Sequence, residues 1–143
     1  MVWKIIPLAL LVGCHHIPEK PSLVVDVSKQ VLEVRVGRTQ KTLQCSTAWR
    51  GTGQTIGSKK TPLGNMVIVD KIASNDPKYR GRVKGDKLWI GGDYCPKDRC
   101  IYIHQSYKPV GTPRSNGCVH LKPNEMDWLF DQIPVGTPIE IRQ

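Results

Sequence analysis

Short apolar segments separated by polar breaks dominate the chain from residue 23 onward. Leu32-Glu33-Val34-Arg35-Val36 places three apolar side chains on one face of an extended strand and two charged side chains on the other. The polar breaks at 28–30 and 37–38 have the length of hairpin turns, so an antiparallel meander is expected at the start of the domain. Further strands are predicted at residues 23–27, 39–45, 66–70, 87–90, 101–104 and 139–142.

One segment near the C-terminus has helical periodicity instead. Four apolar side chains follow the i, i+3, i+4, i+7 spacing of an amphipathic helix: Met126, Leu129, Phe130 and Ile133. Pro123 suits the first turn and Pro134 ends the pattern. The long stretch 46–65 is rich in Gly, Thr and Ser and is expected to be a functional or mobile loop. The sequence therefore predicts a mostly β fold with one short helix in its C-terminal half.

Composition narrows the class of protein. The 143 residues fit one domain, and 13 Gly with 11 Pro indicate a turn-rich chain. The formal charge of +9 suits a partner that carries carboxylates. The basic residues are dispersed and match no nucleic-acid-binding motif, so no nucleic-acid partner is expected.

The N-terminus has the order of an export signal. Lys4 precedes an apolar run over 5–12, which is too short to span a bilayer and is followed by Gly13 and Cys14. Leu11-Val12-Gly13-Cys14 resembles a bacterial lipobox, in which the cysteine is acylated. An apolar N-terminal strand with a chance cysteine is the alternative.

These features divide the chain into three parts. Residues 1–13 are expected to be a lipoprotein signal peptide, 14–21 a tether lipidated at Cys14, and 22–143 the folded domain. The mature protein is then exported and anchored on a membrane, facing the periplasm or the cell wall.

Export changes how the remaining four cysteines are interpreted. Cys95 and Cys100 flank a short segment and could close a small disulfide loop in an oxidising compartment. That pairing would leave Cys45 and Cys118, and an unpaired cysteine in an exported protein is a candidate reactive thiol. Sequence alone does not fix the connectivity.

The candidate chemistry lies between residues 101 and 121. A strand ends with His104, and the turn Ser115-Asn116-Gly117 presents Cys118. A thiol needs a base within hydrogen-bond reach to act as a nucleophile, and backbone amides beside it can form an oxyanion hole. The C-x4-C and C-x-H spacings fit no usual zinc site, so neither a metal nor a cofactor is expected.

With these residues in view, the chain resembles the L,D-transpeptidase catalytic domain family (the YkuD type) of bacterial cell-wall enzymes. The resemblance covers about residues 22–142 and implies a β-sandwich or barrel with one short helix. Matching segments occur in order at the hairpin 23–36, at Lys60-Thr61-Pro62-Leu63-Gly64, at Ile101-Tyr102-Ile103-His104, at 115–121 and at 134–139.

The resemblance also implies roles for individual residues. Family members cut a peptidoglycan stem peptide after its third residue, form a cysteine thioester and pass the acyl group to an amine. Cys118 is then the nucleophile and His104 the base, with the Gln105 carbonyl holding the imidazole ring and the amides of Gly117 and Cys118 binding the oxyanion. The implied oxyanion and substrate group is Gly117, Ser115, Asn116, His120, Gln105 and Arg114.

Three positions depart from the family pattern: Gln105 stands for Gly, Asn116 for His and His120 for Arg. A neutral imidazole cannot make the bidentate contact of an arginine, although Arg114 could reach in from the loop. Two alternatives to transpeptidation therefore stay open. One is a hydrolytic relative, either an L,D-carboxypeptidase or an amidase. The other is an inactive wall-binding lipoprotein in which Cys118 is only a buried structural thiol.

Overall fold

The computed structural model describes residues 19–79, 81–92, 95–96 and 99–143. The expected signal peptide, Cys14 and most of the expected tether lie outside these residues. The prediction of a mostly β fold with one short helix is confirmed. The elements are β1 Ser22–Asp26, β2 Val31–Val36, β3 Thr39–Gln44, β4 Gly64–Ile72, β5 Lys87–Gly91, β6 Ile101–Gln105, β7 Val119–Leu121, α1 Pro123–Gln132 and β8 Pro138–Arg142.

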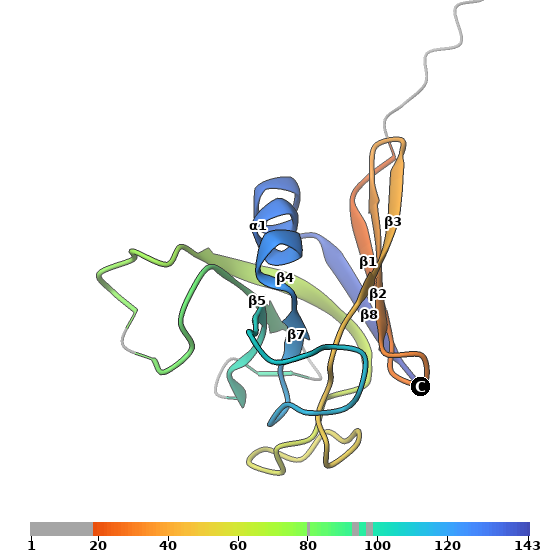
Figure 1. The fold of residues 1–143 in the computed structure, drawn as a ribbon, viewed down its shortest axis with the longest axis vertical. Helices are drawn as coiled ribbons and strands as arrows, with labels where there is room; N and C mark the ends of the chain where they lie inside the picture. The colour runs from red at the N-terminus through yellow and green to blue at the C-terminus, as the bar shows by residue number, and fades with distance from the viewer. Residues whose placement is uncertain (1–18, 80, 93–94, 97–98) are drawn as a thin grey trace, which may run out of the picture.

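All eight strands belong to one sheet in the order β3-β2-β1-β8-β4-β5-β6-β7. The expected meander is present, because β1 pairs with β2 and β2 with β3 in antiparallel register. β8 pairs in parallel with β1, which joins the two ends of the described chain. A bridge between Ser46 and His120 then connects the chain after β3 to β7, so the curved sheet is nearly closed into a barrel (Figure 1).

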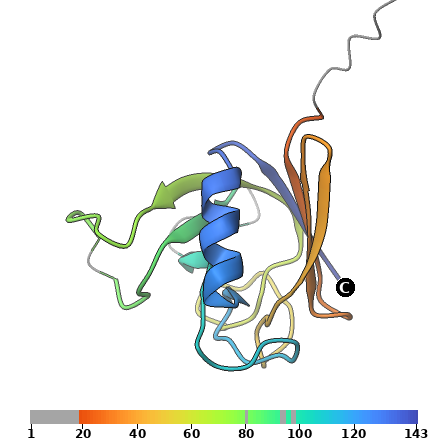
Figure 2. The same cartoon turned by 45° about the horizontal axis from the view of Figure 1, so that its top comes forward.

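The alternating pattern buries one side of these strands. Leu32 and Val34 on β2 are fully buried, as the sequence predicts, whereas Arg35 between them and the turn is exposed. Figure 2 shows α1 lying against the part of the sheet that β5 and β6 form. Its Met126 and Leu129 complete the core from that side. Among the described residues, no helix is long and apolar enough to cross a membrane.

The strand β7 was not predicted from the sequence. Its three residues are too few to show a period, and its stability comes from parallel pairing with the distant strand β6. The pairing sets Val119 beside Ile103 and His120 beside His104. It thereby brings the residue before β7, Cys118, against β6.

The strands β5, β6 and β7 present two different faces. Leu88, Ile103 and Val119 are fully buried in the hydrophobic core and define what we call the core face. The residues between them project to the other side, because side chains alternate along a strand. We call this side the site face; it carries Lys87, Trp89, Tyr102, His104 and His120.

Candidate active site

The turn that presents Cys118 is fixed by hydrogen bonds within it. Ser115 Oγ donates to the Cys118 carbonyl, and the Gly117 N–H donates to Ser115 Oγ at 3.1 Å. Gly117 has a φ of 122°, in the region that favours glycine. A Cβ there would lie 3.0 Å from Ile101 Cδ1 and 3.3 Å from the Lys60 carbonyl oxygen. Glycine is therefore required for the turn to pack this closely.

Thr61 supports this turn from the long loop that precedes β4. Its side chain is fully buried; Oγ1 donates to the Gly117 carbonyl at 2.9 Å and accepts the Ala48 N–H at 2.9 Å. The Thr-Pro motif around Thr61 was visible in the sequence, but the residue was not assigned to the site. Its role depends on a contact across 56 positions of the chain, which no local pattern reveals.

The sulfur of Cys118 is half-buried among backbone groups. The Tyr102 N–H donates to Sγ at 3.4 Å, and the thiol donates to the Cys100 carbonyl at 3.6 Å. Burial raises the pKa of Cys118 to about 11, although the Tyr102 N–H acts in the opposite direction. The resting group at neutral pH is therefore a thiol, and it needs a base to become a nucleophile.

His104, at the end of β6, has the tautomer that a base requires. Its Nδ1 lies 2.8 Å from the Gln105 carbonyl oxygen, the contact that the resemblance implied. Because a carbonyl only accepts, Nδ1 carries the proton and Nε2 of the neutral ring keeps its lone pair. Burial lowers the pKa of His104 below 6.5, with the Gln105 carbonyl acting against it and the Lys87 charge adding to it. Thiol and neutral imidazole thus describe the resting pair better than thiolate and imidazolium.

Cys118 and His104 both line one pocket of about 360 Å³. The rings of His104 and His120 meet edge to face, with their centroids 4.4 Å apart. Gly117 and Gln105, the other predicted site residues, do not line the pocket, and their backbone groups contact Ser115 Oγ and His104 Nδ1. The lining residues are Val83, His104, Ser106, Lys108, Arg114, Ser115, Asn116, Cys118 and His120.

The structure adds detail on three of the predicted site residues, Gly117, Arg114 and His120. The Gly117 N–H is already bonded to Ser115 Oγ, so binding an oxyanion would require its release from that hydroxyl. Arg114 lines the pocket, and its Nε donates to Thr112 Oγ1 at 3.2 Å. His120 is held by backbone bonds to Ser46, and burial together with His104 lowers its pKa to about 4. The position of the family arginine is therefore occupied by an uncharged ring at neutral pH.

The other three cysteines of the described residues are thiols that do not line this pocket. Cys45 is buried, which raises its pKa to about 12 and marks it as structural. The disulfide that the sequence allowed between Cys95 and Cys100 is not formed: Cys95 is a buried thiol 3.6 Å from the Ile90 carbonyl oxygen, and Cys100 is exposed. Within residues 19–79, 81–92, 95–96 and 99–143, no group of three His, Cys, Asp or Glu side chains is placed to hold a metal ion.

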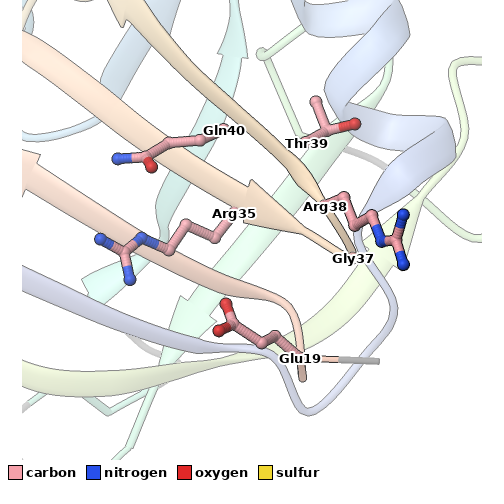
Figure 3. A pocket seen from close by; sticks show the side chains of 6 residues that line it. All are labelled: Glu19, Arg35, Gly37, Arg38, Thr39 and Gln40. Carbon is pink, nitrogen blue, oxygen red and sulfur yellow. The ribbon is translucent and has the colours of Figure 1, made fainter. Parts of the chain in front are cut away.

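A second hollow of about 380 Å³ lies where β2 turns into β3. Figure 3 shows its two arginines, Arg35 and Arg38, extending to opposite sides instead of converging on a point, with Glu19 between them. Its lining residues include no cysteine or histidine. The nucleophile and the base lie in the pocket at β6 and β7, so that pocket is the candidate active site.

Comparison with known proteins identifies similar sequences and similar structures. Over 92 residues the chain is 34% identical to the protein named "Putative L,D-transpeptidase YqjB" of Bacillus subtilis (strain 168), a match that covers 57% of this chain and 51% of the relative. L,D-transpeptidase 3 from Mycobacterium tuberculosis is similar in structure with a TM-score of 0.65 and 17% identity, over 86% of this chain and 62% of that chain. An L,D-transpeptidase from Mycobacterium smegmatis also gives 0.65, with 20% identity over 87% and 59% of the two chains.

The matches span 51% to 62% of the length of these proteins. The family model for the L,D-transpeptidase catalytic domain (YkuD) matches residues 20–141, nearly all of the described part. The chain therefore belongs to the L,D-transpeptidase catalytic domain family.

Proposed function

We propose that this protein is a cysteine-dependent peptidoglycan L,D-transpeptidase with Cys118 as nucleophile and His104 as base. One observation carries the proposal: both side chains line a single pocket, and the Gln105 carbonyl leaves His104 Nε2 as the proton acceptor. Lys108 and Arg114 on the same pocket give it a positive field, which suits the carboxylates of a stem peptide.

The proposed reaction has two halves. Cys118 Sγ attacks the carbonyl carbon of the third stem residue while His104 Nε2 takes the thiol proton. The bond to the following D-alanine breaks, the proton passes to its departing amine, and a thioester remains on Cys118. An acceptor amine then attacks the thioester, gives up a proton to His104 and releases the thiol.

The experiment is to incubate the protein with a disaccharide-tetrapeptide and to separate the products by mass spectrometry, with Cys118→Ala as the control. Cross-linked dimers from the wild type alone support transpeptidation. Trimmed tripeptides without dimers would replace it with the hydrolytic alternative, an L,D-carboxypeptidase. Retention on isolated cell walls with no product would favour the inactive wall-binding alternative.

We also propose that Cys14 anchors the protein in a membrane by acylation. Figure 1 and Figure 2 both place the start of the described chain, next to the β2–β3 turn, and the loop 106–118 at opposite ends of the molecule. A tether at the first end would hold the active site away from the membrane, towards the wall. Detergent-phase partitioning of the exported protein tests this: Cys14→Ser should move it into the aqueous phase, and an unchanged partition would contradict the proposal.

A further inference from the structure

Lys87 is a charged side chain that the proposed reaction does not use, yet only 1% of its surface is exposed. Burying an ammonium group is costly unless its surroundings compensate the charge. Its Nζ lies 3.9 Å from the centroid of the Tyr79 ring, a cation–π contact. Burial lowers the pKa of Lys87, and the charges of Asp86 and Asp76 act in the opposite direction. These contacts keep a positive charge under the loop that joins β4 to β5.

This charge lies beside the catalytic histidine. Lys87 on β5 is paired directly with His104 on β6, and His104 with His120 on β7. Side chains of directly opposed residues on antiparallel strands project to the same face, with Cβ atoms about 4.5–5.5 Å apart. The three residues therefore form a row across the site face. A positive charge in this row opposes protonation of the imidazole.

We propose that Lys87 is a positioning residue of the active site: its buried ammonium group, held under Tyr79, keeps the neighbouring imidazole of His104 available as a proton acceptor. The inference rests on the proposed function, because it concerns the same proton transfer. It extends that function by assigning a task to a residue outside the pocket lining.

The other titratable and charged groups around His104 do not duplicate this effect. On the β7 side, His120 has a pKa of about 4 and Cys118 one of about 11, so both are uncharged at neutral pH. From the loop after β6, Lys108 and Arg114 are exposed, and solvent weakens the field of exposed charges. On the β5 side, Lys87 supplies the buried positive charge.

The test is the pH dependence of Cys118 acylation by a carbapenem, measured on the full chain. Lys87→Met removes the charge and keeps most of the side chain, whereas Lys87→Arg keeps the charge. We expect the acid limb of the rate profile of Lys87→Met to move to higher pH by about one unit, at the low end of the shifts that a nearby charge produces. At a pH well below that limb, acylation should be about tenfold slower than in the wild type. Lys87→Arg should retain the wild-type limb.

Lys71→Met is the matched control. Lys71 on β4 also places its Nζ over an aromatic ring, 4.6 Å from the centroid of Phe130, but it is paired with Leu88 and not with His104. Its profile should equal that of the wild type. An unmoved limb in Lys87→Met would overturn the proposal, and so would equal shifts in Lys87→Met and Lys87→Arg, which would indicate packing instead of charge. Failure of the wild type to be acylated at any pH would instead refute the proposed function.

A measurement on the wild type keeps the proposal testable if Lys87→Met does not fold. Nitrogen NMR of lysine-labelled protein should show Lys87 Nζ protonated throughout the acid limb, while carbon NMR of the imidazole shows His104 titrating below its ordinary value of 6.5. A neutral Lys87 amine across that range would overturn the proposal.

Discussion

The two faces of β5, β6 and β7 use the same backbone for different purposes. On the core face, Leu88, Ile103 and Val119 are fully buried and contribute apolar packing. On the site face, residues one position away along the chain are ionisable, and burial shifts the pKa values of Lys87, His104 and His120. Strand pairing therefore places apolar packing on one face and a row of ionisable side chains on the other. The comparison predicts that changes on one face alter stability and changes on the other alter chemistry.

The largest effect is expected on the site face at His104. His104→Gln removes the proton acceptor, so the rate of Cys118 acylation should fall by roughly 10²–10⁴-fold. The variant should unfold at nearly the same urea concentration as the wild type, because the site is half-buried and polar. Stopped-flow kinetics and a urea titration measure the two quantities. A variant that reacts at the wild-type rate would remove His104 from the mechanism.

Ile103, the residue before His104, tests the core face. Ile103→Ala leaves a cavity beside α1 and should lower the free energy of unfolding by about 2–5 kcal/mol. The matched variant Ile103→Val should cost only about 0.5–1.5 kcal/mol. The acylation rate of the folded fraction should stay within a few-fold of the wild type. A loss of rate as large as that of His104→Gln would show that the two faces cannot be separated.

Thr61→Val tests the connection between the two faces, because Thr61 links the buried core to the turn that carries Cys118. The substitution leaves the Ala48 N–H and the Gly117 carbonyl without their partner. A cost of about 1–3 kcal/mol in the free energy of unfolding is expected for such buried groups. Thr61→Ser, which keeps the hydroxyl, is the control and should cost less. Equal losses in the two variants would mean that the hydroxyl does not support the turn.

The remaining prediction concerns the pH dependence of stability. The pKa of His120 is lowered from 6.5 in the unfolded chain to about 4 in the fold, so the unfolded state binds more protons between these values. Stability should therefore fall as the pH drops from about 6.5 to about 4. Urea titrations at both ends of this range should show a smaller fall for His120→Asn. The same fall in both proteins would contradict the shifted pKa.

The sequence predicted the regular parts of the fold because their causes are local. Strict alternation over 32–36 specifies a strand with one buried face, and apolar spacing over 126–133 specifies an amphipathic helix. The predicted 66–70 strand is longer in the structure, Gly64–Ile72, because pairing with both β5 and β8 extends it beyond its apolar centre. β7 was missed because three residues are too few to show a period, and its stability comes from pairing with the distant strand β6.

The candidate site was predictable only in part. Cys118 and His104 could be named from their motifs, and the structure places both on one pocket. Lys87 could not be recognised, because in sequence it is one more charged residue at a strand end. Its burial depends on Tyr79 folding over it from the loop that precedes β5. The hydrogen bond from the Gly117 N–H to Ser115 Oγ could not be predicted either, since it depends on the conformation of the turn.

The most direct test of the account is the intact mass of the protein after incubation with a carbapenem. The thiol adds to the β-lactam carbonyl and the ring C–N bond opens, so the protein should gain the whole mass of one inhibitor molecule. The account predicts one adduct on the wild type and none on Cys118→Ala. A folded wild type that stays unmodified, or an adduct that persists in Cys118→Ala, would contradict it.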